Sequence, residues 1–213
     1  MTRYDHSWFA SWYPTLAAAT DRAGFARHRT ALLAGLHGTV VEIGAGSGQN
    51  LPYYPTDVDR VVAVEPEATM RVKARAAAIG ATVPVEVVGA AAQSLPFADA
   101  SVDTVVASLM LCSVADQAAV LAEIRRVLRP SGQFRFLEHV ISMRRGVARG
   151  QRILDATYLW TLIGAGCHCA RDTAAAVYDA GFDVDSLERF VFPDRGLRRP
   201  TAPHIIGVAT PPV

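Results

Sequence analysis

The chain has 213 residues, with 21 basic and 20 acidic side chains and a formal net charge of +1. This is the length of one domain with a sizeable core, and the balanced charge excludes a general affinity for polyanions such as nucleic acids. No apolar run approaches the roughly 20 residues that span a bilayer, and charged side chains interrupt any N-terminal apolar segment, so neither stable membrane insertion nor a signal peptide is expected. The three cysteines are too few for a disulfide framework and favour a reducing, cytoplasmic location.

Residues 1–37 are predicted to form an N-terminal helical cap in front of a single globular unit, residues 38–213. The cap holds a helix before Pro14 and a second over residues 17–36, the latter followed by Gly38. Aromatic residues spaced four apart share one face of the first helix, namely Tyr4, Trp8 and Trp12. This face is predicted to dock on the domain. The alternative is a lid over a binding site, with Tyr4 or Tyr13 touching the ligand.

A glycine turn follows the first predicted strand. The apolar residues up to Ile43 lead into the spacing G-x-G-x-G, with Glu42 two places before the first glycine. Glycine allows a tight turn and a close approach of the backbone to a ligand, because it has no Cβ. A dinucleotide fingerprint would instead read G-x-G-x-x-G. The residues expected at an adenosine-type cofactor are Glu42, Gly44, Ala45, Gly46, Gly48 and Asn50.

Strands and helices then alternate. The second strand, residues 60–64, ends at Glu65, where a carboxylate can accept hydrogen bonds from both hydroxyls of a ribose. A plain surface charge is the alternative. Pro66 then opens a helix. Further strands are expected at 83–88, 101–108, 134–138, 187–192 and 204–209, with helices at 67–79, 118–128, 151–163 and 172–180. Residues 144–152, which include Gly146 and Gly150, are expected to be a linker. This alternation predicts an α/β fold with a largely parallel sheet and helices on both faces.

These motifs resemble those of the class I S-adenosylmethionine (SAM) methyltransferases, in particular the methyltransferase type 11 domain. The resemblance implies a Rossmann-like, seven-stranded, mostly parallel sheet with an antiparallel last strand. It also implies SAM as cofactor and S-adenosylhomocysteine as product. Residues 90–97 are similar to the family's segment G-D-A-x-x-L-P-F. In that family the aspartate of this segment holds adenine, and Ala91 stands at its position here. Gln93 is the suggested substitute. The further cofactor-contacting residues implied are Glu65, Pro66, Ala91, Ala92, Gln93, Ser108 and Leu109.

Three later motifs are similar to the methyltransferase-like thiol S-methyltransferases and their bacterial relatives. They are L-C-S-V at 111–114, E-H-V at 138–140 and G-C-x-x-x-R-D-T at 166–173. The resemblance implies S-methylation of a small thiol. O-, N- or C-methylation of a quinone, phenol, lipid amine or secondary metabolite stays open within the enzyme class. A nicotinamide oxidoreductase and a non-catalytic SAM-binding protein are the alternatives from other classes. Nucleic-acid methylation is not expected, since no N/D-P-P-Y/F motif follows the fourth strand.

His139 is the first candidate for the group that assists the acceptor, because it lies at the carboxyl edge of the sheet and titrates near neutrality. A histidine bonded to neighbouring backbone is the alternative, and His168 is a second catalytic candidate. The triplet Cys167-His168-Cys169 suggests a metal, but a structural zinc needs four ligands, so no metal is predicted. Cys112 is expected to be a small buried side chain. The substrate-binding candidates are Tyr4, Tyr13, Leu111, Trp160, Cys167 and Arg171. The oligomeric state is left open between monomer and homodimer.

Overall fold

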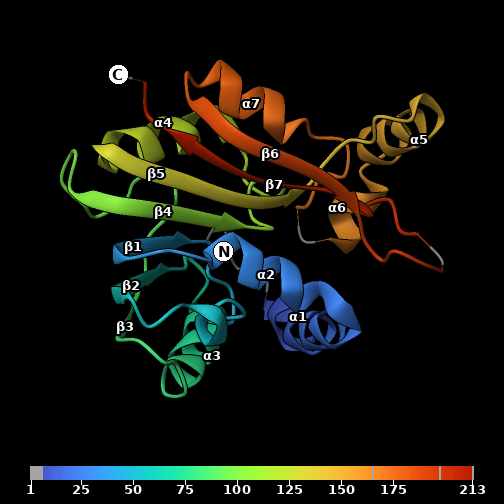
Figure 1. Ribbon diagram of the computed structural model, residues 1–213. Helices are drawn as coiled ribbons and strands as arrows, with labels where there is room; N and C mark the ends of the chain where they lie inside the picture. The colour runs from blue at the N-terminus through green and yellow to red at the C-terminus, as the bar shows by residue number, and fades with distance from the viewer. Residues whose placement is uncertain (1–6, 165, 197, 213) are drawn as a thin grey trace.

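The computed structural model describes residues 7–164, 166–196 and 198–212. They form one seven-stranded sheet in the order β3-β2-β1-β4-β5-β7-β6 (Figure 1). Strands β1 to β5 are parallel to one another, and β7 is antiparallel to both β5 and β6. The predicted sheet with its antiparallel last strand is confirmed. The strands are β1 (Gly38–Ile43), β2 (Val58–Val64), β3 (Val85–Val88), β4 (Val102–Ser108), β5 (Leu128–His139), β6 (Asp183–Val191) and β7 (Pro203–Thr210).

The sheet has a hydrophobic core on each face, because successive strand residues point to opposite sides. On β1, Val41 belongs to the core cluster that includes the apolar residues of α4 (Gln117–Val127) and α7 (Thr173–Asp179). Val40 belongs to the other cluster, with residues of α2 (Ala26–Leu33) and the segment after it. Helix α3 (Ala68–Ala78) follows β2. Helices therefore cover both faces, as the alternation predicts.

Three helices begin at acidic side chains that cap them. The side chains of Glu67, Asp116 and Asp172 accept hydrogen bonds from the third backbone N–H of α3, α4 and α7, respectively. Such a bond satisfies one of the four free N–H groups at a helix start. The positions at which these helices start are thus set locally by the sequence.

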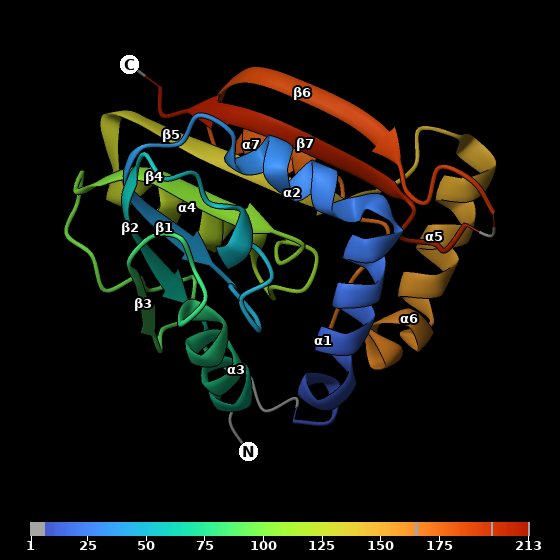
Figure 2. The ribbon, with the colours of Figure 1, turned by 60° about the horizontal axis from the view of Figure 1, so that its bottom comes forward.

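The cap differs from its prediction in one respect. Helix α1 (Ser7–Thr20) runs through Pro14 and continues into the π-helical η1 (Asp21–Phe25), where Gly24 has a φ of 110°. Proline costs an interior helix one backbone hydrogen bond but need not end it. Figure 2 shows α1 between α3 and α6 (Leu159–Ile163), and Lys73 of α3 donates to the carbonyl of Ala10 at 2.6 Å. The chain direction changes at the glycine rather than at the proline.

A second difference concerns residues 144–152, which were expected to be a linker. They form the start of α5 (Arg145–Ala156), and the predicted helix over 151–163 is divided at Tyr158, which has a φ of 55°. Gly146 and Gly150 lower helix propensity and suggested a linker. The helix is held instead by tertiary contacts of Gln151, whose side chain donates to the Pro200 carbonyl at 2.7 Å and accepts from Ser142 N–H at 2.8 Å.

Within the described ranges, no helix has both the length and the apolar character needed to cross a membrane.

Candidate active site

The glycine turn and Glu65 meet at the carboxyl ends of β1 and β2. The N–H of Gly46 donates to Glu65 Oε2 at 2.8 Å, and Glu65 Oε1 accepts from Glu67 N–H at 2.9 Å. Gly44 and Gly46 have φ values of 64° and 56°, in the left-handed region that favours glycine. A Cβ on Gly46 would meet no atom within 4 Å, so open space lies in front of the turn. We call Gly44, Gly46 and Glu65 the cofactor cradle, and this arrangement fits an adenosyl cofactor.

A buried polar network supports the cradle from behind. Glu42 accepts hydrogen bonds from Asn50 Nδ2 at 2.8 Å and from the Tyr54 hydroxyl at 2.9 Å. Arg29 donates to Asn50 Oδ1 at 2.8 Å and forms an ion pair with Asp21, also at 2.8 Å. Burial raises the pKa of Glu42 to about 7, against the lowering effect of these hydrogen bonds. The polar atoms of the Glu42 and Asn50 side chains are thus hydrogen-bonded within the protein, and these bonds hold the glycine turn in place.

The sequence did not reveal the roles of Arg29 and Tyr54. A single arginine in a helical segment is normally solvated, so only tertiary structure shows that Arg29 is buried, with 3% exposure. Arg29 also approaches Ser108 Oγ at 3.4 Å, which joins the end of β4 to the same network. The network connects the N-terminal helices to the turn that follows β1.

The other predicted cofactor residues lie beside the same sheet edge. Pro66 follows Glu65, and the Arg71 guanidinium donates to both of their carbonyls, at 2.6 and 3.0 Å. In the loop after β3, Ala92 is buried in a core cluster, and Ser94 N–H donates to the Ala91 carbonyl at 3.0 Å. Ala91 has only a methyl side chain at the position where the family resemblance implies an aspartate, and Gln93 remains the suggested adenine contact. The remaining members of the predicted set are Ala45 and Gly48 of the turn and Leu109 after β4.

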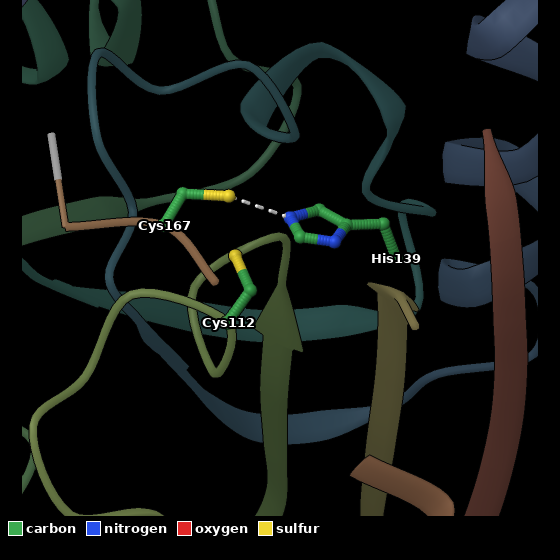
Figure 3. A group of neighbouring side chains, drawn as sticks. All are labelled: Cys112, His139 and Cys167. Carbon is green, nitrogen blue, oxygen red and sulfur yellow. Dashed lines mark hydrogen bonds between the residues drawn. The ribbon is translucent and has the colours of Figure 1, made fainter. Parts of the chain in front are cut away.

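A group of soft ligands lies at the ends of β4 and β5. Cys112, His139 and Cys167 place their sulfur and nitrogen atoms within 4.8 Å of one another, and Cys167 Sγ lies 3.0 Å from His139 Nε2 (Figure 3). We call these three residues the Cys–His–Cys cluster. Cys112 follows β4, His139 ends β5, and Cys167 comes from the loop between α6 and α7. The backbone N–H of His168 donates to the Cys112 carbonyl at 2.9 Å and fixes the two loops together.

The cluster lies in a desolvated environment. Cys112 and His139 are 2% and 6% exposed. The neighbouring Cys167 thiol and burial raise the pKa of Cys112 well above its usual range. Burial lowers the pKa of His139, but the adjacent Cys112 and Glu138 more than offset this, so its pKa is raised. His139 Nδ1 has no hydrogen-bond partner in the described part of the chain. Cys112 is buried, as predicted, but its membership of this cluster was not foreseen.

Glu138 fixes the loop that carries Cys112. Its Oε1 accepts from the N–H groups of Met110 and Leu111 at 2.9 and 2.8 Å, and burial raises its pKa. Arg171 donates to the Leu111 carbonyl at 2.6 Å. Leu111 itself is fully buried in the core. The contacts that Leu111 makes with Glu138 and Arg171 come from its backbone, and contact of its side chain with the substrate stays a prediction.

The other candidates fall into separate positions. His168 is half-buried, with Nδ1 3.7 Å from Asp155 Oδ2, and burial lowers its pKa. Trp160 of α6 is half-buried, and its Nε1 has no hydrogen-bond partner among the described residues. Tyr13 of α1 lies close enough to Cys112 to interact electrostatically, and burial raises the pKa of its hydroxyl. Tyr4 lies outside the described residues.

The strand order, the glycine turn after β1 and the carboxylate after β2 together define a SAM-dependent methyltransferase. The family described as "Methyltransferase domain" matches residues 41–136. Thiol S-methyltransferase TMT1B of Mus musculus is 37% identical over 182 residues, covering 83% of this chain and 73% of that protein. Thiol S-methyltransferase TMT1A of Homo sapiens is 35% identical over 176 residues, covering 80% of this chain and 70% of that protein.

The chain belongs to this family of SAM-dependent methyltransferases, and SAM is its cofactor. A ubiquinone/menaquinone biosynthesis C-methyltransferase of Acidiphilium cryptum is also similar, at 33% identity over 79% of this chain and 61% of that protein. Among solved structures, a SAM-dependent methyltransferase of Thermotoga maritima superposes with a TM-score of 0.70 at 20% identity, covering 96% of this chain and 98% of that one. This last likeness confirms the fold.

Proposed function

We propose that this methyltransferase acts on the thiol of a small, hydrophobic molecule and produces a methyl thioether. Two relatives named thiol S-methyltransferases, each matching about four-fifths of the chain, support the choice of acceptor. A cytoplasmic location is proposed with it, on the cysteine content given above. Residues 1–37 are proposed as a helical cap on the globular unit formed by residues 38–213. Nucleic acid is not proposed as a substrate.

The observation that carries the proposal is the position of the Cys–His–Cys cluster next to the cofactor cradle. Met110 connects the two: an added Cβ on Gly44 would lie 2.7 Å from Met110 Cβ, while Met110 N–H donates to Glu138, the neighbour of His139. The cradle and the cluster are therefore adjoining parts of one sheet edge. An acceptor held at the cluster is positioned to face a cofactor held at the cradle.

Bound SAM supplies a methyl group on a positively charged sulfonium. The chain must hold the acceptor sulfur about 3 Å from the methyl carbon and in line with the bond that breaks. The acceptor gives its proton to the medium, and its sulfur lone pair forms the new S–C bond. The electron pair of the broken bond stays with the departing sulfur, so both products are neutral thioethers. Because thiols have pKa values of about 8.5, modest stabilisation of the thiolate suffices.

We assign this stabilisation to His139 and the two thiols around it, with His168 as a second candidate. The Glu65 carboxylate is assigned to the ribose hydroxyls, and the backbone of the glycine turn to the methionine half of the cofactor. Tyr13, Trp160 and Arg171 are assigned to the acceptor side. Their mix of aromatic surface and one cation suits a largely apolar molecule.

An acceptor panel tests the proposal. The purified chain is incubated with SAM labelled in the methyl group and with alkyl thiols, aryl thiols, phenols, amines and quinols, and the labelled products are separated. Transfer to thiols and not to phenols or amines is the expected result. Transfer to quinols alone would replace S-methylation by C-methylation, and no transfer to any acceptor despite SAM binding would leave a non-catalytic SAM-binding protein. Thermal stabilisation by NAD and not by SAM would indicate an oxidoreductase.

A further inference from the structure

We propose that Cys112, His139 and Cys167 bind a zinc ion with three protein ligands, and that the acceptor thiol takes the fourth position. The inference rests on the proposed function and specifies how the acceptor is activated. It gives His139 the role of a metal ligand through Nε2, the atom that faces Cys167 Sγ.

The donor set determines the choice of metal. Thiolates and imidazole together favour zinc among the available divalent ions, whereas magnesium and calcium prefer oxygen ligands. A structural zinc site is closed by four protein ligands, while a catalytic site has three and leaves one position for substrate or water. Among the described residues, the only group of three or more such side chains with atoms this close is Cys112, His139 and Cys167. Two cysteines and one histidine make the open, catalytic type.

The spacing is close to what zinc requires. Zn–S and Zn–N bonds of about 2.3 and 2.0 Å place tetrahedral ligand atoms roughly 3.5–3.8 Å apart. The three atoms here lie within 4.8 Å, with one pair at 3.0 Å. The Cys167–His139 pair is thus closer than tetrahedral spacing by roughly half an ångström. In Figure 3 both sulfur atoms and the edge of the imidazole ring point toward one another.

The chain holds the three ligands by contacts that do not involve a metal. Glu138 fixes the Cys112 loop through Leu111 N–H, and His168 N–H fixes the Cys167 loop to the Cys112 carbonyl. His139 pairs with His204 in the ladder between β5 and β7. Such a preformed site lowers the ordering cost of binding an ion.

The third cysteine of the chain serves as an internal comparison. Cys169 Sγ lies 3.3 Å from Asp155 Oδ1 and 3.6 Å from the Gln151 carbonyl, and it is not a member of the cluster. The sequence triplet Cys167-His168-Cys169 is therefore not the ligand set. The structure divides it: Cys167 joins Cys112 and His139, while the His168 side chain lies near Asp155. Cys169 offers a matched control for each cysteine ligand.

Coordination explains the chemistry that the acceptor needs. A thiol bound to zinc gives up its proton to the medium and remains as a thiolate with its remaining lone pairs available. The bound thiolate then attacks as described above, and the thioether product, a weak ligand, leaves the fourth position. No change of oxidation state occurs at the metal, because Zn²⁺ has no redox chemistry.

Metal binding is tested first, without an activity assay. The full chain is kept reduced with a phosphine, stripped with a chelator and titrated with Co²⁺ as a spectroscopic probe for zinc. We expect one equivalent to give the thiolate-to-cobalt charge-transfer band and the visible bands of tetrahedral cobalt. Zn²⁺ should displace it. Adding a small thiol should change the visible bands, because the fourth ligand changes. Absence of these bands overturns the proposal. So does a disulfide between Cys112 and Cys167 that still forms under these reducing conditions and leaves no thiolates to bind the metal.

Variants locate the site. Cys112→Ser and Cys167→Ser are each expected to weaken Co²⁺ binding at least a hundredfold, and His139→Ala to do the same. Cys169→Ser should bind Co²⁺ as the wild type does. Circular dichroism and SAM binding by calorimetry show whether each variant is folded. Equal loss of Co²⁺ binding in a folded Cys169→Ser variant, or retention in folded Cys112→Ser and Cys167→Ser variants, refutes the assignment.

The zinc proposal and the proposed S-methylation can be refuted independently of each other. If the chain binds zinc in the cluster but methylates no thiol, the proposed function is wrong and the metal site stands. If the stripped chain methylates thiols as fast as the zinc-loaded one, S-methylation stands and zinc activation is refuted. We expect chelation to lower the rate at least tenfold and zinc to restore it.

Discussion

The buried carboxyl group of Glu42 makes the stability of the protein depend on pH, and this can be worked out from its surroundings. In the folded chain its pKa is about 7, compared with 4.5 for an ordinary glutamate. The difference of about 2.5 corresponds to roughly 3 kcal/mol, at about 1.36 kcal/mol for each pKa unit. Because the folded state holds the proton more tightly, this stability is fully present below pH 4.5 and is lost as the pH rises through 7.

The perturbation is Glu42→Gln, which keeps the shape of the side chain and an acceptor for Asn50 but cannot ionise. Urea unfolding of wild type and variant at a series of pH values gives the free energy of unfolding of each. Between pH 5 and pH 8 the wild type should lose about 2.5 kcal/mol relative to the variant. Contributions from other titrating groups cancel in the difference.

A difference between wild type and Glu42→Gln that stays constant across this range would refute the assignment, since Glu42 would then be ionised in the folded chain throughout. Tyr54→Phe provides a second check. The Tyr54 hydroxyl donates to Glu42 and lowers its pKa, so its removal should move the loss of stability to higher pH. A shift toward lower pH would contradict the hydrogen-bond geometry.

Three further outcomes are expected. Glu65→Gln should weaken SAM binding at least tenfold in calorimetry. A glutamine amide has only one acceptor oxygen, so it cannot accept both from Gly46 N–H and from the ribose hydroxyls as the two carboxylate oxygens can. Unchanged affinity would remove Glu65 from the cofactor site. Gly207→Ala should destabilise the chain by about 1–3 kcal/mol in urea unfolding, since the new Cβ overlaps the Phe136 ring, and an unchanged midpoint would contradict the packing of β7 on β5. Asp172→Ala should cost about 1 kcal/mol through loss of the α7 cap, whereas Asp172→Asn should keep most of it.

The parts of the fold that the sequence predicts are those controlled by local chemistry. The strand leading to Gly44 and the alternation of strands with helices depend on neighbours in the chain. The α5 helix was missed for the opposite reason. Its glycines favour a linker, and the contacts of Gln151 that hold it come from residues up to 49 positions away.

The buried network behind the cradle was not predictable for a related reason. Glu42 and Asn50 are close in sequence, and their position beside the glycines suggested contact with the cofactor. Their hydrogen bonds go instead to each other, to Tyr54 and to Arg29. A sequence shows which polar side chains are near a motif, but the buried partner that satisfies them is fixed only when the N-terminal helix packs.

The two halves of the candidate site differ in how far the sequence determines them. Strand order alone brings Glu65 to Gly46, since β1 and β2 are neighbours and parallel strands end at the same edge. The same rule brings Cys112 toward His139, because each follows or ends one strand of the β4–β5 pair. The position of Cys167 does not follow from strand order. Cys167 lies on a loop between two helices, and the hydrogen bond from His168 N–H to the Cys112 carbonyl holds this loop at the sheet edge. The cofactor half of the site thus follows from topology, whereas the acceptor half depends on one long connection whose path no local pattern determines.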